Sequence, residues 1–171
     1  MKASIALIAH NYNTSRMAED YIKELYSPIA LYSEQLMKNN LADLKRMVAW
    51  KQEISNRFNV VKIKAIFING IQNGKITSDG LIKIKLLIFS GEITSNELEV
   101  EFVLIKKDEG EFVTEPIVVR LHHLVSQEED VLTYVAEYHI EDTGFYAYGI
   151  RVLPYSNMLF RIQDAELVYW G

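Results

Sequence analysis

The stretch "LIKIKLLIF", residues 81–89, alternates apolar and charged side chains over most of its length. Ile82, Ile84, Leu86 and Ile88 are spaced two positions apart, and Lys83 and Lys85 lie on the opposite side of the alternation. Successive side chains of a β-strand point to opposite faces, so this spacing predicts a strand with one buried and one solvated face. The stretch "ELEVEFVLI", residues 97–105, repeats the pattern with glutamates on its polar side.

The same period of two recurs in five further segments of the chain. These segments are "VVKIKAIFI", "PIVVRLHHL", "VLTYVAEYHI", "FYAYGIRVL" and "AELVYW". Turn-forming pairs, such as Asn73-Gly74 and Asp79-Gly80, separate them. Seven short strands with turns at this spacing predict an antiparallel β-sandwich of immunoglobulin-like type over residues 59–171.

Residues 14–58 have a helical period instead. The first apolar stripe, with steps of three and four, comprises Ala18, Ile22, Leu25, Ile29, Tyr32 and Leu36. Pro28 cannot donate a hydrogen bond to the carbonyl of Glu24, which predicts a kink or a restart there. A second helix is expected after "KNN", with Asn40 as its cap and with the buried stripe Leu41, Leu44, Met47, Trp50, Ile54 and Phe58. The fold class is therefore α+β, with a helical segment at 1–58 and a β-sandwich at 59–171.

Composition narrows the classes of partner. The 171 residues carry a net charge of −5, which argues against a nucleic-acid partner. The lysines that do cluster alternate with apolar residues, as on the solvated face of strands; they are Lys62, Lys64, Lys83 and Lys85. No apolar run reaches the length that a bilayer requires, so no membrane partner is expected. The absence of cysteine excludes disulfides and thiolate metal sites and is consistent with a cytoplasmic location.

The sequence contains few candidates for catalysis. His122 and His123 are adjacent on a predicted strand, so their side chains point to opposite faces and cannot hold one metal ion. His139 shares a strand face with Glu137 and Glu141, which more readily forms a solvated surface than a metal site. The acidic run Glu128-Glu129-Asp130 is expected in a loop. These residues indicate a domain that supports chemistry performed elsewhere, with no catalytic and no metal-binding residue.

The segment "FYAYGIRVL", residues 145–153, has two interpretations. Alternation places Tyr146 and Tyr148 on one face and Arg151 on the other. Tyrosine rings stack on sugars while their hydroxyls hydrogen-bond, so these three residues are candidates for carbohydrate binding. The favoured interpretation is a core strand, with the tyrosines buried and Arg151 paired with a carboxylate.

The first 30 residues, "MKASIALIAHNYNTSRMAEDYIKELYSPIA", resemble the last helices of α-glucan (glycogen) phosphorylases. In that family a "MK-x-SI" helix leads through a "FNT-x-RM" turn to a helix with "EY…Y-x-P". The matching residues are Met1, Lys2, Ser4, Ile5, Asn13, Thr14, Arg16, Met17, Tyr21, Tyr26 and Pro28. Tyr12 stands where the turn often has phenylalanine, and Asp20 replaces the glutamate before the tyrosine.

The end of the chain is similar to the same family. "GFYAYGIRVLP" and the later "AELVYW" resemble a C-terminal β-module of one bacterial and archaeal branch, and "MVAWKQEISNRF" resembles the linking helix of that branch. The resemblance covers nearly the whole chain. It implies that residues 1–58 end a catalytic domain and that residues 59–171 form an accessory module.

The family resembled consists of pyridoxal-phosphate-dependent glycosyltransferases that split α-1,4-glucan with phosphate to give glucose 1-phosphate. Their cofactor lysine lies in a "GTSNMK"-like motif upstream of the segment matched here, and "YSNML" at 155–159 lacks the lysine. The resemblance therefore implies no catalytic and no cofactor-binding residue in this chain, and pyridoxal phosphate only in a full-length parent. It also implies the upstream catalytic lobes of the same polypeptide as partner, and α-glucan as the candidate ligand of Tyr146, Tyr148 and Arg151.

Three other interpretations stay open at this stage. The first is a freestanding carbohydrate-binding module that uses its tyrosines with Trp50 or Trp170. The second is an assembly domain that forms a homo-oligomer through its helices or a sheet edge. A small hydrolase comes last, because no pair of nucleophile and base can be named. The sequence also leaves open whether the sandwich binds glucan, mediates subunit contacts or only stabilises.

Overall fold

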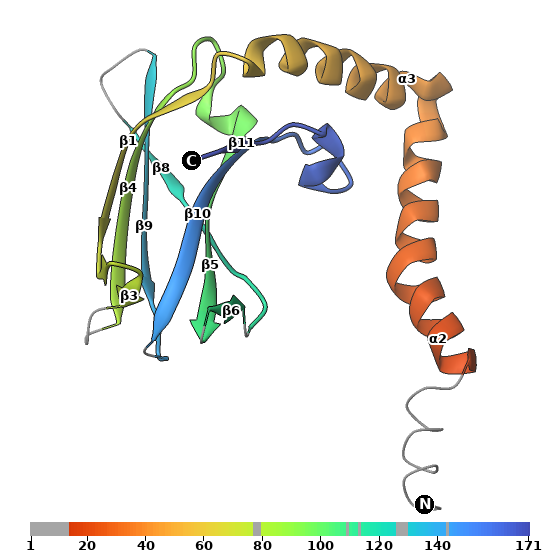
Figure 1. Cartoon of the computed structure of the whole chain (residues 1–171). Helices are drawn as coiled ribbons and strands as arrows, with labels where there is room; N and C mark the ends of the chain where they lie inside the picture. The colour runs from red at the N-terminus through yellow and green to blue at the C-terminus, as the bar shows by residue number, and fades with distance from the viewer. Residues whose placement is uncertain (1–13, 77–79, 109, 113, 126–129, 143) are drawn as a thin grey trace, which may run out of the picture. The chain divides into compact units, whose positions relative to one another are not determined.

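The structure is a computed structural model of the chain, and it describes residues 14–76, 80–108, 110–112, 114–125, 130–142 and 144–171 (Figure 1). Helices occupy the first part and antiparallel sheets the second, which confirms the α+β class. The chain divides into two compact units, Met1–Ala49 and Trp50–Gly171. The predicted boundary after residue 58 stays a prediction.

Three consecutive helical elements begin the described chain: α2 (Thr14–Tyr21), η1 (Ile22–Tyr26) and α3 (Ser27–Phe58). The element η1 is a π-helical turn, in which the Ser27 N–H donates to the carbonyl of Ile22, five residues earlier. Pro28 follows Ser27 directly in the chain. The interruption expected at this proline thus takes the form of a widened turn, which leaves room for the ring against the preceding carbonyls.

The second predicted break lies within α3. Asn40 and Leu41 have left-handed backbones, with φ of 55° and 62°, although helical residues continue on both sides. Asparagine tolerates this conformation, whereas leucine adopts it at a cost. Across this point the Tyr32 hydroxyl donates to Met47 Sδ at 3.2 Å. The backbone at Asn40 is therefore distorted within one helix, and the prediction that Asn40 caps a separate helix was wrong.

The first unit, Met1–Ala49, which we call the helical unit, buries little of its apolar stripe. No residue of α2 or η1 is buried, and Ile22 and Ile29 are 56% and 47% exposed. In contrast, Ile54 and Phe58, near the end of α3, belong to the second unit and are 0% and 6% exposed. The C-terminal part of α3 is therefore anchored in the β-core, while the preceding stripe is accessible.

Two antiparallel sheets and the end of α3 make up the second unit, which we call the β-unit. The four-stranded sheet has the order β1 (Lys62–Asn69), β4 (Leu81–Phe89), β9 (Val131–His139) and β8 (His122–Leu124). The seven-stranded sheet has the order β2 (Ile71–Gln72), β3 (Lys75–Ile76), β10 (Phe145–Pro154), β5 (Leu98–Asp108) and β6 (Glu111–Phe112). In addition, β7 (Ile117–Arg120) pairs with β5 and β11 (Tyr169–Trp170) with β10. Short 3₁₀ turns, η2 (Ser95–Glu97) and η3 (Ile162–Ala165), precede β5 and β11.

The described strands number eleven, four more than the seven segments expected from the sequence. Three of the additional strands, β2, β3 and β6, are two residues long and lie between the segments predicted as strands. The segment "PIVVRLHHL" divides at Leu121 into β7 and β8, which join different sheets. Leu121 is buried, and its N–H donates to the carbonyl of Val100 at 2.8 Å. The immunoglobulin-like topology stays a prediction.

The core lies between the inner faces of the two sheets (Figure 1). One continuous cluster joins side chains of both, including Ile82, Ile84, Leu86 and Ile88 of β4, Tyr134 and Ala136 of β9, Val100, Phe102 and Leu104 of β5, and Tyr146, Ile150 and Val152 of β10. The alternation in residues 81–89 and 97–105 therefore predicted the buried faces correctly. The lysines named above lie on the exposed side, as expected.

An ion pair fastens α3 to the start of β5. Arg57 donates to Glu97 Oε1 at 2.6 Å, and the Thr94 N–H and hydroxyl each donate to the same carboxylate at 3.0 Å. Burial opposes ionisation of Glu97, but the bonds from Arg57 and Thr94 outweigh it and lower the pKa of Glu97 below its ordinary value. The charged carboxylate therefore stabilises the fold.

Truncating a buried aromatic side chain should destabilise the fold more than truncating an exposed one. Phe102→Ala is expected to lower the free energy of unfolding by about 3–5 kcal/mol, because Phe102 is fully buried. The control Phe112→Ala, at a residue that is 62% exposed, should stay within about 0.5 kcal/mol of the wild type. Urea unfolding followed by circular dichroism measures both. An equal loss of unfolding free energy in the two variants would contradict the placement of Phe102 in the core.

The Arg57–Glu97 pair predicts a pH dependence. Because the pKa of folded Glu97 lies below the unfolded value near 4.5, its contribution is complete above that value and is lost as pH falls through the folded pKa. Glu97→Gln should therefore cost about 1 kcal/mol at pH 7 and nothing at the lowest pH at which the fold persists. Glu53→Gln, at a residue with a mostly exposed side chain, serves as control. A pH-independent loss in Glu97→Gln would rule this explanation out.

Candidate functional site

The two candidate tyrosines of β10 occupy different environments. Tyr146 is 5% exposed, and its hydroxyl donates to the carbonyl of Asp142 at 3.2 Å. Burial raises the pKa of this hydroxyl. Tyr148 is 49% exposed, and its ring centroid lies 5.5 Å from that of Phe102. Tyr146 is thus a core residue, as the favoured interpretation expected. The same interpretation was wrong for Tyr148, which is half exposed and only contacts the edge of the core through Phe102.

Arg151 lies on the opposite face of β10 and is paired with the carboxylate of Glu101, as the core interpretation expected. Glu101 is 3% exposed and stands between two arginines, Arg151 on β10 and Arg120 on β7, in one cross-strand row. Trp170 continues the row beside Arg151. Arg151 is therefore occupied in the sheet, and the three residues predicted as a glucan site do not form one surface.

A second carboxylate completes this cluster. Arg120 Nε lies 2.7 Å from Glu99 Oε1. Burial, together with the neighbouring Glu101 carboxylate, raises the pKa of Glu99, although Arg120 and Arg151 oppose the change. Because the charges alternate and pair along the row, we interpret the cluster as structural.

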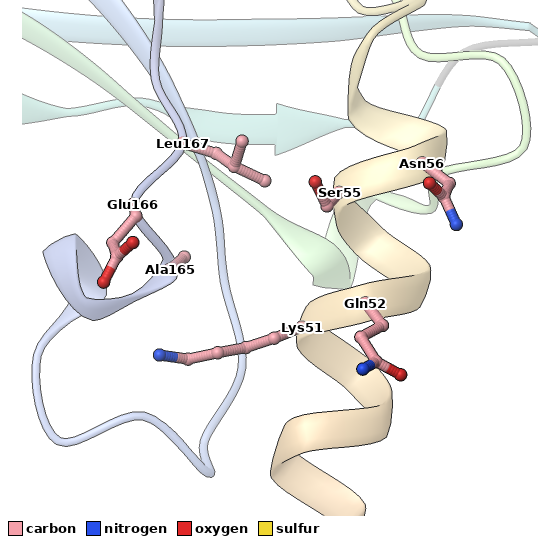
Figure 2. A pocket seen from close by; sticks show the side chains of 7 residues that line it. All are labelled: Lys51, Gln52, Ser55, Asn56, Ala165, Glu166 and Leu167. Atoms are coloured by element: carbon pink, nitrogen blue, oxygen red, sulfur yellow. The ribbon is translucent and has the colours of Figure 1, made fainter.

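A hollow of about 780 Å³ lies between α3 and the segment that includes the end of η3. Figure 2 shows the side chains that line it. Its lining residues are Lys51, Gln52, Ser55, Asn56, Ala165, Glu166 and Leu167. Most of these described lining residues are polar, and none of them is aromatic. Glu166, at the end of η3, has a left-handed backbone with φ of 60°, and its N–H donates to the Gln163 carbonyl at 2.9 Å. This hollow is therefore shaped in part by a strained residue.

A hollow of about 630 Å³ lies on the outer face of the four-stranded sheet, and we name it the Phe67 hollow. Its lining residues are Phe67, Asn69, Lys83, Ile84, Lys85, His122, Val135, Ala136 and Glu137. Lys83 and Glu137 form an ion pair at 3.0 Å. None of these lining residues was named as a site by sequence reasoning.

A third hollow, of about 360 Å³, is lined by Tyr146 together with Lys106, Thr114, Glu115, Ile117, Tyr138, His139, Ile140, Glu141 and Asp142. Lys106 and Asp142 are paired there at 3.1 Å. Tyr146 therefore reaches a small cavity even though most of its surface is buried.

The histidines show no metal-binding arrangement within the described residues, where no group of three or more His, Cys, Asp or Glu could hold a metal ion. His122 lines the Phe67 hollow, while the ring of His123 contacts Tyr134 on the inner side, at 5.6 Å between centroids. The two histidines thus point to opposite faces, as predicted. Of the acidic run, Glu128 and Glu129 lie outside the described residues.

The segment Tyr155–Leu159 does not fit a pyridoxal phosphate site. It forms a turn in which the Met158 N–H donates to the Ser156 hydroxyl at 3.2 Å, and it contains no lysine for a Schiff base. This segment therefore offers no amine to which pyridoxal phosphate could be bound. In the described part of the chain, no helix is long and apolar enough to cross a membrane.

Comparison with known proteins defines the class. A family model of the glycogen phosphorylase C-terminal domain matches residues 59–171, which is most of the chain and almost all of the β-unit. The chain therefore belongs to the glycogen phosphorylase C-terminal domain family.

A particular relative is the maltodextrin phosphorylase of Thermococcus litoralis, which is 26% identical over 173 residues. The alignment covers 99% of this chain and 20% of the relative, so the chain spans about a fifth of that enzyme. No solved structure matches the chain. The resemblance found in the sequence to the C-terminal end of an α-glucan phosphorylase is thereby confirmed.

The strained backbone at Glu166 gives a testable consequence. Glu166→Gly should raise the free energy of unfolding by about 0.5–1 kcal/mol, because glycine adopts the left-handed conformation without steric cost. Gln163→Gly, three residues earlier within η3, should lower it by a similar amount. Thermal and urea unfolding measure both variants. A loss of stability in Glu166→Gly would show that its side chain stabilises the fold more than its backbone strains it.

Proposed function

We propose that this chain is the non-catalytic C-terminal part of an α-glucan phosphorylase, a glycosyltransferase that releases glucose 1-phosphate from glucan. The observation that carries the proposal is the alignment, which takes in 99% of this chain but a fifth of a maltodextrin phosphorylase. Catalysis and pyridoxal phosphate would then belong to the remaining four fifths of such an enzyme. A cytoplasmic location is part of the same proposal.

The helical unit provides the physical link to upstream lobes of the same polypeptide. Exposed apolar side chains follow one another along α2, η1 and α3, including Met17, Ile22, Ile29, Leu31, Met37 and Val48. Exposed apolar side chains in this number are typical of an element that packs against another protein surface. Packing these residues against catalytic lobes would remove them from water.

The β-unit would act as an accessory module. Its continuous core and the anchoring of α3 by Ile54, Phe58 and the Arg57–Glu97 pair connect the linking helix to a stiff body. A rigid module attached through a helix can position a ligand surface or a subunit contact beside the catalytic lobes. This accessory role does not require a reacting group in the β-unit.

An activity assay tests the proposal. The purified chain, given maltodextrin, inorganic phosphate and pyridoxal phosphate, should form no glucose 1-phosphate, because the reacting groups lie in upstream lobes. A coupled assay for glucose 1-phosphate measures the product, and intact maltodextrin phosphorylase is the positive control. Phosphate-dependent product that scales with the amount of this chain would overturn the proposal.

A further inference from the structure

We propose that the Phe67 hollow binds a short segment of an α-1,4-glucan chain, with Phe67 stacking on a glucosyl ring. The choice of glucan as the sugar rests on the proposed function, to which this inference adds a ligand site. The position and chemistry of the site follow from the hollow itself.

A β-bulge makes this hollow. The pairing of β1 with β4 shifts between Ile63 and Ala65. Ile63 is opposite Ile88, whose side chain is in the core, yet Phe67 is opposite Lys85 on the outer face. Without the extra residue, the alternation would place Phe67 on the same side as Ile63. Bulges often redirect a side chain at a functional site, and here one turns an aromatic ring outward, where it is 53% exposed.

Two cross-strand rows form the surface around that ring. One row contains Phe67, Lys85, Val135 and His122, from β1 across β4 and β9 to β8. The other contains Asn69, Lys83 and Glu137. Four strands are about 14 Å across, at three spacings of about 4.8 Å, so the first row suits a short oligosaccharide. The volume of about 630 Å³ lies within the range of ligand sites.

The side chains supply both kinds of contact that a sugar requires. An exposed aromatic ring packs against the apolar face of a pyranose. Beside it, Asn69 both donates and accepts hydrogen bonds, Lys83 and Lys85 donate, and Glu137 accepts. Sugar hydroxyls both donate and accept, so this mixture matches them.

The charges favour a neutral ligand over an anion. Lys83 is already paired with Glu137 at 3.0 Å, and both side chains are more than half exposed. A phosphate group near Lys83 and Lys85 would also meet the Glu137 carboxylate. An uncharged glucan chain can hydrogen-bond to all three without this repulsion.

Two other hollows, described above, fit a glucan less well. Among the described residues that line the one in Figure 2, none is aromatic. The hollow at Tyr146 is smaller, about 360 Å³, and the Tyr146 hydroxyl already donates to the carbonyl of Asp142. Of these three hollows, the Phe67 hollow combines an exposed ring with polar groups across four strands.

Calorimetric titration of the whole chain with maltoheptaose tests the site. Phe67→Ala should weaken binding about tenfold, the amount expected for one lost ring contact. Asn69→Trp should abolish binding by filling the hollow without removing a buried group. Phe112→Ala and Phe145→Ala, at exposed aromatic residues of the seven-stranded sheet, are the matched controls and should bind as the wild type does. Circular dichroism confirms that each variant is folded.

Several results would overturn the proposal. These are no binding of maltoheptaose by the wild type, unchanged binding in both Phe67→Ala and Asn69→Trp, or loss of binding in Phe145→Ala instead. Equal affinity for cellohexaose would refute specificity for the α-1,4 linkage, and displacement by glucose 1-phosphate or inorganic phosphate would show an anion site. Failure here leaves the phosphorylase assignment intact, whereas glucose 1-phosphate formation by the isolated chain would refute that assignment and leave the sugar site standing.

Discussion

Burial of apolar side chains between the two sheets is the interaction on which the described β-unit depends. Fully buried residues of β4 and β5, such as Leu86 and Phe102, meet in one cluster that also takes in Ile54 of α3. This cluster fixes the register of the long β5–β10 pairing and determines which side of each strand faces outward. It also anchors the end of the linking helix. The outer faces of the sheets are consequently the surfaces on which ligand contacts can be built.

The two outer faces differ in what they offer. On the seven-stranded sheet, Glu101 is buried between Arg120 and Arg151, so the charged groups there largely satisfy one another. On the four-stranded sheet, the bulge in β1 exposes Phe67 beside polar side chains. The helical unit adds further exposed apolar side chains, such as that of Ile22. Under the proposals made above, Phe67 contributes to sugar binding and these helical side chains contact catalytic lobes.

The sequence predicted those parts of the fold that depend on local periodicity. Alternation in residues 81–89 located β4 and its buried face, and the same pattern identified Tyr146 as a core residue and Arg151 as the partner of a carboxylate. It did not reveal the division of one segment at Leu121, because the apolar pattern continues there while the hydrogen-bonding partner changes. Nor did it reveal the Phe67 hollow, since a bulge reverses the faces without any signal in the spacing. The predicted triad of Tyr146, Tyr148 and Arg151 combined residues from opposite faces of one strand.

Sequencing the gene upstream of the codon for Met1 decides whether this chain is the C-terminal part of a phosphorylase polypeptide. If it is, the open reading frame continues upstream, encodes catalytic lobes and includes a "GTSNMK"-like motif with the cofactor lysine. Those lobes would supply a protein surface for the exposed apolar side chains of the helical unit. An in-frame stop codon directly before Met1, with no such lobes encoded in the same frame, would show that the chain is not part of such an enzyme.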